Sequence, residues 1–276
     1  MATTEQAELK QRKSGTPTFR VLGVRVNAVQ IPDIIEVMEK WISDRSATNY
    51  VAVTGMHGVA ESRTDPYFRG ILDTAGLVIP DGMPLVWLGR LQGHGEVKRR
   101  TPGAEVMEAF FQATGSKYSH FFYGGVPGIA DLLAKTEHEK HGIRIAGTYC
   151  PPFRPLNAAE EEEVKKLVEE TKPDILWVGL STPKQEKWMY EHRDKINVPV
   201  MLGVGAAFDM NTGRLKRAPV WMQDRGLEWL FRLILEPRRL WRRYLVVGSS
   251  FAWAVWREHI VPSIFKRQVT APAVPE

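Results

Sequence analysis

Short apolar runs rich in β-branched residues alternate along this chain with longer segments that have the apolar spacing of amphipathic helices. Such alternation is typical of βαβ units, in which helices cover both faces of a mostly parallel sheet. The sequence therefore predicts a doubly wound α/β fold over residues 17–219. The runs expected to form its strands are 49–54, 76–80, 117–123, 143–148, 174–180 and 198–204, with a strand pair over 19–30 before them.

The composition is that of an ordinary globular protein, so a sizeable core is possible. The 276 residues contain one cysteine, Cys150, which excludes an intramolecular disulfide framework and a cysteine-rich zinc site. Residues 1–16 are polar and charged and contain no apolar stretch of the kind found in signal peptides. We therefore expect a disordered tail over 1–16.

Positive charge is concentrated in one part of the chain. Residues 214–243 hold nine basic and three acidic side chains, although the whole chain has a net charge of only +5. A localised basic patch indicates an anionic partner. Residues 220–276 are also rich in Trp and Leu and lose the strand–helix alternation. The prediction is a Rossmann-like α/β core with a helical, Arg-rich C-terminal appendage.

The longest apolar run of this appendage is 244–256, shorter than the roughly 20 residues that a helix needs to span a bilayer. It directly follows the cationic stretch 238–243. Cations beside Trp and aliphatic side chains are typical of a helix that lies on an anionic membrane surface. The alternative is an amphipathic helix packed on the core or on another subunit.

Asp81 stands directly after the apolar run 76–80. Open α/β sheets bind ligands at the carboxyl ends of their strands. A carboxylate in that position can take a proton from a substrate hydroxyl. The alternative is that Asp81 only caps the helix expected to begin near Met83.

Loops rich in glycine or small polar residues follow four predicted strands, at 54–57, 80–82, 124–128 and 203–209. In a doubly wound sheet these loops meet at one edge, where glycine turns let backbone N–H groups approach a phosphate. Together they predict a nucleotide or nucleotide-sugar site. Thr54 is a candidate to orient a sugar hydroxyl or to cap its helix. Gln185, near a helix start, is a binding candidate or an ordinary surface residue.

Several familiar nucleotide and metal sites are missing from the sequence. The glycine pattern at 203–208 lacks the third small residue of the dinucleotide fingerprint, which argues against a nicotinamide-dependent oxidoreductase. There is no Walker A motif and no Asp-x-Asp pair, and His57 has no partner at zinc-ligand spacing. A diphosphate bound without metal needs cations, and guanidinium groups bind phosphate with two hydrogen bonds.

Five blocks of sequence, in order, are similar to those of one known family. They are the strand end at Thr54, Val78-Ile-Pro-Asp81-Gly82, Pro183-Lys-Gln-Glu-Lys-Trp188, the stretch 203–209 with 213–219, and 227–237 with the arginines after it. In these blocks the chain resembles the WecB/TagA/CpsF glycosyltransferases, glycosyltransferase family 26. The likeness covers about residues 19–245.

The resemblance implies transfer of a sugar, with inversion, from a UDP-sugar to a polyprenyl-diphosphate-linked acceptor, without a required metal or other cofactor. By resemblance, Asp81 would be the general base and Thr54 its neighbour in the pocket. The residues implied to form the nucleotide pocket are Gln185, Gly203, Gly205 and Asp209. Those implied to contact the diphosphate are Arg232, Arg239 and Arg242.

One departure from the family pattern matters. Many members have Asn two residues after the threonine, where this chain has Met56. We therefore do not extend N-acetylmannosamine specificity to it.

The leading hypothesis is a peripheral enzyme at the cytoplasmic face of the bacterial inner (plasma) membrane that serves exopolysaccharide, surface polysaccharide or teichoic acid biosynthesis. Its expected partners are a UDP-sugar donor, a polyprenyl-diphosphate-linked acceptor and the membrane surface. No nucleic-acid partner is expected, and a homo-oligomer is left open. The alternative is a non-catalytic, membrane-surface adaptor that binds nucleotide sugars.

Overall fold

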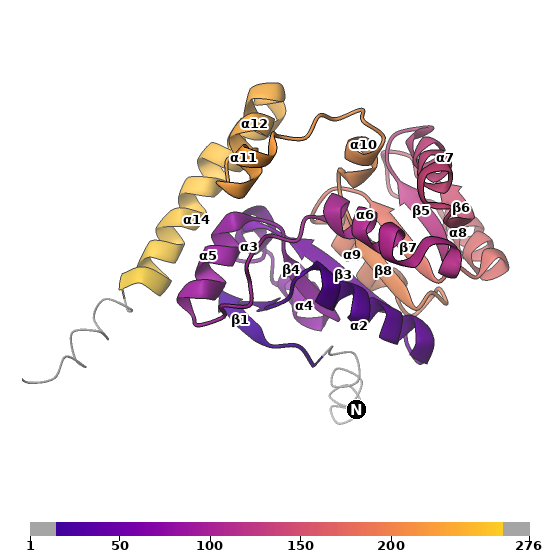
Figure 1. Ribbon diagram of the computed structural model, residues 1–276, viewed down its shortest axis with the longest axis horizontal. Coiled ribbons are helices and arrows are strands. Elements are labelled where there is room, and N and C mark those ends of the chain that lie inside the picture. The colour runs from indigo at the N-terminus through magenta and orange to yellow at the C-terminus, as the bar shows by residue number, and fades with distance from the viewer. Residues whose placement is uncertain (1–14, 262–276) are drawn as a thin grey trace, which may run out of the picture.

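The computed structural model of the protein describes residues 15–261. Its centre is a six-stranded parallel sheet with the strand order β4-β3-β8-β7-β5-β6 (Figure 1). The strands are β3 (Asn49–Thr54), β4 (Leu77–Pro80), β5 (Ser119–Gly124), β6 (Arg144–Tyr149), β7 (Ile175–Gly179) and β8 (Val200–Gly203). The Rossmann-like α/β fold expected from the sequence is confirmed.

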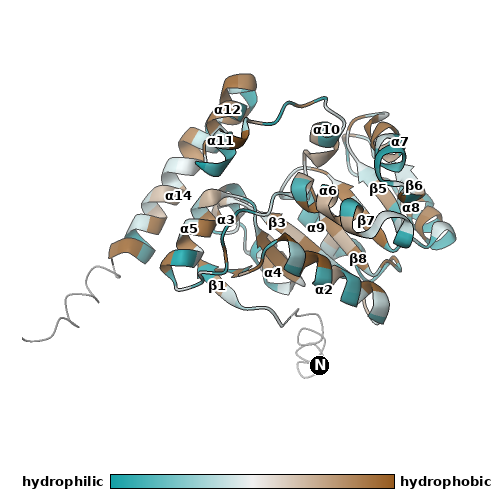
Figure 2. Ribbon diagram, in the orientation of Figure 1, coloured by the Kyte–Doolittle hydropathy of each residue, from teal (hydrophilic) through white to brown (hydrophobic). Residues whose placement is uncertain are grey.

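Successive side chains of each strand pack on opposite faces of the sheet, as strand geometry requires. In β3, Tyr50 and Ala52 belong to one hydrophobic core, and Val51 belongs to the other. Because helices cover both faces, strands such as β4, β7 and β8 are continuous apolar runs rather than alternating ones. Figure 2 shows this as brown along β3 and β8.

Helices pack on both faces of the sheet and form one core on each. Those that contribute to the first core are α3 (Met56–Glu61), α4 (Pro66–Thr74), α5 (Met83–Leu91), α8 (Ala158–Thr171) and α9 (Lys184–His192). Those of the second core are α2 (Ile31–Asp44), α6 (Gly103–Thr114), α7 (Ile129–His141) and α10 (Ala207–Asn211), and the short 3₁₀ turn η1 (Gly115–Lys117) follows α6.

The neighbouring strands β3 and β8 send the chain to opposite faces. The helix after β3, α3, packs in the first core, whereas α10, after β8, packs in the second. Ligand sites of doubly wound sheets form at such a switch point, outside the carboxyl ends of the strands. We call the carboxyl ends of β4, β3 and β8 the carboxyl edge.

Two segments near the N-terminus were also predicted. The strand pair is present as an antiparallel hairpin of β1 (Thr18–Val21) and β2 (Val24–Asn27). The predicted disordered tail, 1–16, lies outside the described residues except at its end. There the Thr16 hydroxyl accepts a hydrogen bond from Asn27 Nδ2 at 2.7 Å.

The stretch between Thr54 and Thr74 is helical and forms two helices, α3 and α4. The chain turns before Pro66, which stands first in α4. The side chain of Asp65 caps α4 by accepting a hydrogen bond from the Phe68 N–H at 3.0 Å. The cap and the proline together start a new helix.

A helical C-terminal segment follows the sheet and lies along one side of it, beside α3 and α5 (Figure 1). Its pieces are α11 (Val220–Asp224), α12 (Glu228–Leu235), α13 (Pro237–Trp241), η2 (Arg242–Val247), α14 (Gly248–Val255) and η3 (Trp256–Ile260). From α13 to η3 the helix is unbroken, with π-type turns at η2 and η3. The remainder of the predicted appendage, 262–276, lies outside the described residues.

This C-terminal segment is buried on one face only. Leu240 and Phe251 are buried, and Phe251 joins the first core. Most of the exposed large apolar side chains of residues 15–261 also lie in the segment, among them Trp221, Ile234 and Trp253. No helix within the described part of the chain is both long enough and apolar enough to cross a membrane.

Candidate active site

Thr54 and Asp81 lie side by side at the carboxyl edge. The N–H of Asp81 donates a hydrogen bond to the Thr54 carbonyl at 3.0 Å, continuing the pairing of β3 with β4. The backbone N–H of Thr101 donates to the Pro80 carbonyl at 2.7 Å. Helix α5 has Gly82 at its N-cap and no side-chain cap, so Asp81 does not serve as the cap. Backbone contacts therefore hold this carboxylate at the sheet edge and leave its side chain available.

The environment of Asp81 favours its protonated form more than water would. The side chain is partly buried, and burial is the main cause that raises the pKa of Asp81 above its ordinary value. The carboxylate of Glu228 raises this pKa further, whereas Arg100, Arg243 and Arg232 act to lower it. A carboxylate with a raised pKa and cations nearby is suited to accept a proton from a substrate.

Arg100 and Glu228 are two site residues that sequence reasoning missed. They form an ion pair, with Arg100 Nη1 2.6 Å from Glu228 Oε2, and the Arg100 side chain is only 11% exposed. The pair joins the loop before α6 to the first residue of α12. The run of three cations at 98–100, soon after the Asp81 block, was the available signal.

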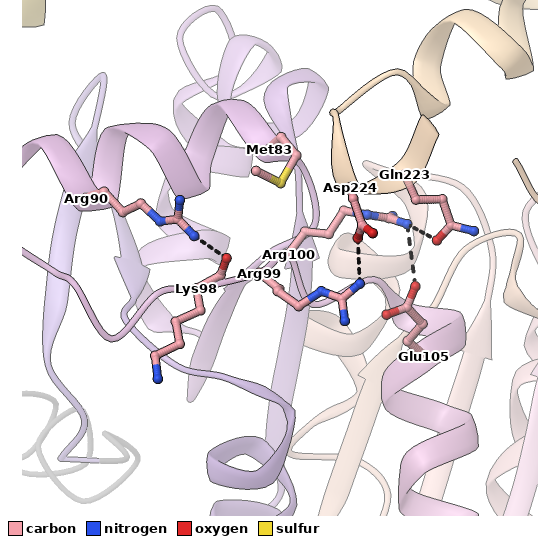
Figure 3. Close-up of a pocket in the computed structure, with 8 residues that line it drawn as sticks. All are labelled: Met83, Arg90, Lys98, Arg99, Arg100, Glu105, Gln223 and Asp224. Atoms are coloured by element: carbon pink, nitrogen blue, oxygen red, sulfur yellow. Dashed lines mark hydrogen bonds and ion pairs between the residues drawn. The ribbon is translucent and has the colours of Figure 1, made fainter. Parts of the chain in front are cut away.

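A cavity of about 230 Å³ opens next to Arg100, between α5, the loop before α6, and α11 (Figure 3). Its lining residues are Met83, Arg90, Lys98, Arg99, Arg100, Glu105, Gln223 and Asp224. Arg99 pairs with Asp224 at 2.6 Å, and Arg100 donates to Gln223 Oε1 at 2.6 Å. Cations outnumber carboxylates in this lining, so the cavity suits an anionic group.

Gln185 is buried at the start of α9, and both ends of its amide are used inside the protein. Its Oε1 accepts a hydrogen bond from the Gly205 N–H at 2.9 Å, and its Nε2 donates to Glu186 Oε1 at 3.1 Å. The hydroxyl of Thr182, which precedes a cis proline, donates to the same Glu186 oxygen at 2.9 Å. Gln185 thus ties the loop after β8 to α9.

Gly203 and Gly205, the two predicted glycines, allow the loop after β8 to lie close to Gln185. A Cβ on Gly203 would lie 2.9 Å from Gln185 Nε2, closer than side chains pack. Gly205 has φ +58°, a left-handed conformation that favours glycine. Asp209 lies further along, in α10, and contacts Arg214 at 3.6 Å. The structure therefore brings Gln185, Gly203 and Gly205 together, with Asp209 facing a different partner.

The three predicted arginines of the C-terminal segment occupy different environments. Arg232 is partly buried and acts electrostatically on Asp81. Arg239 and Arg242 are exposed, and Arg239 pairs with Glu236 at 2.5 Å. The neighbouring Arg243, which sequence reasoning did not select, is partly buried, and burial is the main cause that lowers its pKa. Of the three predicted arginines, only Arg232 thus acts on the Asp81 carboxylate together with Arg243.

His57, in the first turn of α3, also faces this region. Its Nδ1 is buried and has no hydrogen-bond partner among residues 15–261. Burial, and secondarily Arg243, lowers the pKa of His57 to about 4, so the ring is neutral at pH 7.

One group of side chains in the described structure has the spacing of metal ligands. Possible ligand atoms of Glu108, Glu137 and His141 lie within 4.8 Å of one another, on α6 and α7. Lys140 Nζ is 2.5 Å and His141 Nε2 is 3.2 Å from the same Glu108 oxygen. These contacts form an ion-pair network near β6. In the strand order β6 is the outermost strand on the side away from β4, the strand that Asp81 follows.

The structure thus brings a carboxylate at the carboxyl ends of a parallel sheet together with arginines from a C-terminal helix. The chain belongs to the glycosyl transferase WecG/TagA/CpsF family, whose model matches residues 19–264. The expected family and enzyme class are confirmed, and with them a role in polysaccharide biosynthesis. The adaptor alternative is thereby set aside.

Three similar curated proteins carry the same name, N-acetylglucosaminyldiphosphoundecaprenol N-acetyl-beta-D-mannosaminyltransferase. The protein of Bacillus subtilis (strain 168) is 28% identical over 230 residues, covering 83% of this chain and 87% of the relative. That of Bacillus spizizenii is 26% identical, covering 79% and 83%. That of Staphylococcus aureus (strain MRSA252) is 25% identical, covering 84% and 90%.

Proposed function

We propose that this protein is an inverting glycosyltransferase that moves a sugar from a UDP-sugar to a polyprenyl-diphosphate-linked acceptor. It would act as a peripheral enzyme at the cytoplasmic face of the bacterial inner membrane, in surface polysaccharide or teichoic acid synthesis. The observation that carries the proposal is the environment of Asp81. This carboxylate has a raised pKa and stands at the carboxyl edge among Arg100, Arg232 and Arg243, with Glu228 paired to Arg100.

In the proposed reaction, Asp81 removes the proton from the acceptor hydroxyl. The resulting oxygen attacks the anomeric carbon from the face opposite the nucleotide, and the bond from that carbon to the diphosphate oxygen breaks. The electron pair leaves on UDP. One displacement inverts the anomeric carbon and needs no second carboxylate as nucleophile.

Negative charge develops on the departing diphosphate, and fixed cations stabilise it most effectively where water is excluded. Arginines, and not a metal ion, would stabilise the charge on the departing diphosphate. The nucleotide would lie over the loop after β8, which Gln185, Gly203 and Gly205 shape. Asp209 remains a proposed part of that pocket, and Thr54 would orient the reacting sugar beside Asp81.

The acceptor class rests on the relatives and on the surface of the C-terminal segment. The relatives' name specifies N-acetylglucosaminyldiphosphoundecaprenol, an acceptor on a membrane lipid. In this chain, Arg238 and Arg242 are exposed beside exposed Trp241 and Leu245. Cations next to Trp and aliphatic side chains favour contact with anionic lipid, so the segment would bring the site to the membrane.

The direct test is a panel of UDP-sugars with a short-chain prenyl-diphosphate-N-acetylglucosamine acceptor. We expect UDP release that requires the acceptor, persists in EDTA, and gives a product whose new linkage has the opposite anomeric configuration to the donor, as measured by NMR. Absence of transfer from every UDP-sugar, or retention of configuration, would contradict the proposal. Loss of activity in EDTA with recovery in manganese would show that arginines alone do not stabilise the leaving group.

A further inference from the structure

Helices α6 and α7 bring two carboxylates and an imidazole together in the second core. Glu137 and His141 are four residues apart on α7, so their side chains share one face of that helix. Glu108, on α6, meets this face, and its Oε1 lies 3.2 Å from His141 Nε2. Figure 1 shows α7 beside β5 and β6, the strands of the sheet that are farthest in strand order from β4. The group is therefore separate from the site around Asp81.

The Glu137 carboxylate is buried without the contacts that a buried charge needs. The residue is 1% exposed, and its Oε2 has no hydrogen-bond partner among residues 15–261. The same oxygen lies 3.6 Å from His141 Nε2, so it faces the other members of the group. Buried charges in proteins are paired and hydrogen-bonded, or they bind metal ions. The unused oxygen of Glu137 therefore points to a cation between the two helices.

Lys140 is a cation of this region, but it serves a different carboxylate. Its Nζ lies 2.5 Å from Glu108 Oε1, and within the described chain no ion pair joins it to Glu137. The Lys140 side chain is 54% exposed and can withdraw into water. Lys140 thus neutralises Glu108 when no metal is bound and leaves Glu137 without a partner.

The distances between the possible ligand atoms fit a zinc ion. Zinc bonds to imidazole nitrogen and carboxylate oxygen are about 2.0–2.2 Å long, so neighbouring ligand atoms of a tetrahedral site lie about 3.3–3.5 Å apart. The two distances from His141 Nε2, 3.2 Å to Glu108 and 3.6 Å to Glu137, lie close to this value. All three ligand atoms lie within 4.8 Å of one another. A small movement of Glu108, which is 30% exposed, would complete the geometry.

The chemistry of the donor set also selects the kind of metal. One imidazole nitrogen with two carboxylate oxygens is a combination that Zn²⁺ accepts. Mg²⁺ and Ca²⁺ prefer six or more oxygen ligands, and imidazole is not among the ligands they favour. Three protein ligands leave the fourth position of a tetrahedral site to a water molecule.

We propose that Glu108, Glu137 and His141 bind a zinc ion that joins α6 to α7. Each carboxylate supplies one oxygen, and His141 supplies Nε2 in its unprotonated form. Lys140 leaves Glu108 when the ion binds. The ion stabilises the packing of two core helices and lies apart from the residues proposed to act on the sugars.

The test is Zn²⁺ binding to the untagged full chain, after treatment with EDTA and removal of the chelator. Calorimetry should show one tight site per chain in wild type. The variants Glu137→Gln and His141→Gln should each weaken this site about 100-fold or more, since even the partners of metal ligands contribute about 10–100-fold. Glu139→Gln and His138→Gln make the same changes at exposed positions of α7 and should bind Zn²⁺ as wild type does.

Thermal unfolding gives a second measurement, because an ion that binds only the folded chain raises its melting temperature. Zn²⁺ should raise the melting temperature of wild type and of the two control variants, but not that of Glu137→Gln or His141→Gln. Mg²⁺ at the same concentration should have no such effect. Lys140→Gln should bind Zn²⁺ more tightly than wild type, because no ammonium group then competes for Glu108.

Should Glu137→Gln fail to fold, Glu108→Gln changes a partly exposed ligand and should lose the same site. Absence of a tight Zn²⁺ site in wild type, or equal affinity in wild type and the ligand variants, would show an ion-pair network that binds no metal and would overturn the inference. Weaker binding in Lys140→Gln, or an equal response to Mg²⁺, would overturn it as well. None of these measurements uses sugar transfer, so a wild type without transferase activity would contradict the proposed function alone.

Discussion

The α/β core and the C-terminal helical segment contribute different halves of the candidate site and are held in different ways. Apart from the edge strand β6, the strands of the sheet are buried on both faces, and even Trp177 is 0% exposed. The C-terminal segment rests on the core through one stripe of side chains, and its other surfaces expose residues such as Ile234 and Trp253. The base, Asp81, belongs to the core, whereas Arg232 and Arg243 belong to the segment.

This difference shows how the site is completed. Parallel strands fix Asp81 by backbone hydrogen bonds that do not depend on the C-terminal segment. The arginines reach it only because Leu240 and Phe251 seat the segment against the core. Elements with few buried apolar contacts open more readily than core strands. The position of the proposed base should therefore be more robust than the position of the cations.

The largest effect should come from the core half of the site. Asp81→Asn keeps the shape of the side chain but cannot accept the proton, so we expect turnover to fall by about 10²–10⁴-fold. Steady-state kinetics and UDP calorimetry measure the two consequences, and nucleotide affinity should change little. A variant with normal turnover would remove Asp81 from the role of base.

The second prediction loosens the segment while sparing the core. Phe251→Ala leaves a cavity under α14 and should weaken the packing of the segment by about 3–5 kcal/mol. Hydrogen exchange should then quicken in α13 to η3 and stay slow in β3 and β8, with activity reduced. Trp253→Ala, at a side chain that is 62% exposed, is the matched control and should leave exchange unchanged. Equal acceleration in the sheet strands would mean that the two regions unfold as one unit.

The third prediction concerns a contact inside the core. Gln185→Ala removes a buried side chain that accepts the hydrogen bond of the partly buried Gly205 N–H, and it should lower the free energy of unfolding by about 1–3 kcal/mol. Gln112→Ala, on the exposed surface of α6, provides the control and should be nearly neutral. Denaturant unfolding measures both. An unchanged midpoint for Gln185→Ala would show that this amide does not hold the loop after β8.

The smallest expected effects concern pH and stability at Asp81. Because burial raises the pKa of Asp81, the acid limb of kcat/KM should lie above the pH at which an ordinary aspartate titrates. The same shift means that the ionised form of Asp81 lowers the free energy of unfolding once the pH exceeds the pKa that Asp81 has in the unfolded chain. The Asp81→Asn variant should thus have a higher melting temperature than wild type at pH 7, by roughly 2–4 °C for each kcal/mol gained in the free energy of unfolding. The difference in melting temperature should vanish in acid, where Asp81 is protonated in both the folded and the unfolded chain. A lower melting temperature at pH 7 would show that the arginines outweigh burial.

Local patterns in the sequence were enough to predict most of the core. Asn157 directly precedes the acidic stretch of α8, as an N-cap residue does, and its Oδ1 accepts hydrogen bonds from the N–H groups of Ala159 and Glu160 at 3.0 Å. The strand before Asp81 and the helix from Met83 were also predicted correctly. Caps, proline positions and continuous apolar strands act within a few residues, so they can be read along the chain.

Contacts between distant segments could not be predicted in this way. Sequence reasoning missed Arg100 and Glu228, which only the docking of α12 brings together. It selected Arg242 by resemblance; in the structure Arg242 is exposed, and its neighbour Arg243 is partly buried and acts electrostatically on Asp81. Which of two adjacent arginines faces a site depends on the rotation of the helix and on the surface beneath it.

The sequence by itself determined the parallel α/β architecture, the place of Asp81 at a strand end, and the change of character near Pro219. Each follows from local apolar spacing and backbone preference, which need no knowledge of distant residues. Only the tertiary structure decided that β8 lies beside β3, that Gln185 holds the loop after β8, and that Arg232 and Arg243 share the surroundings of Asp81. These outcomes depend on how whole faces pack, and packing selects among partners that sequence spacing leaves equivalent.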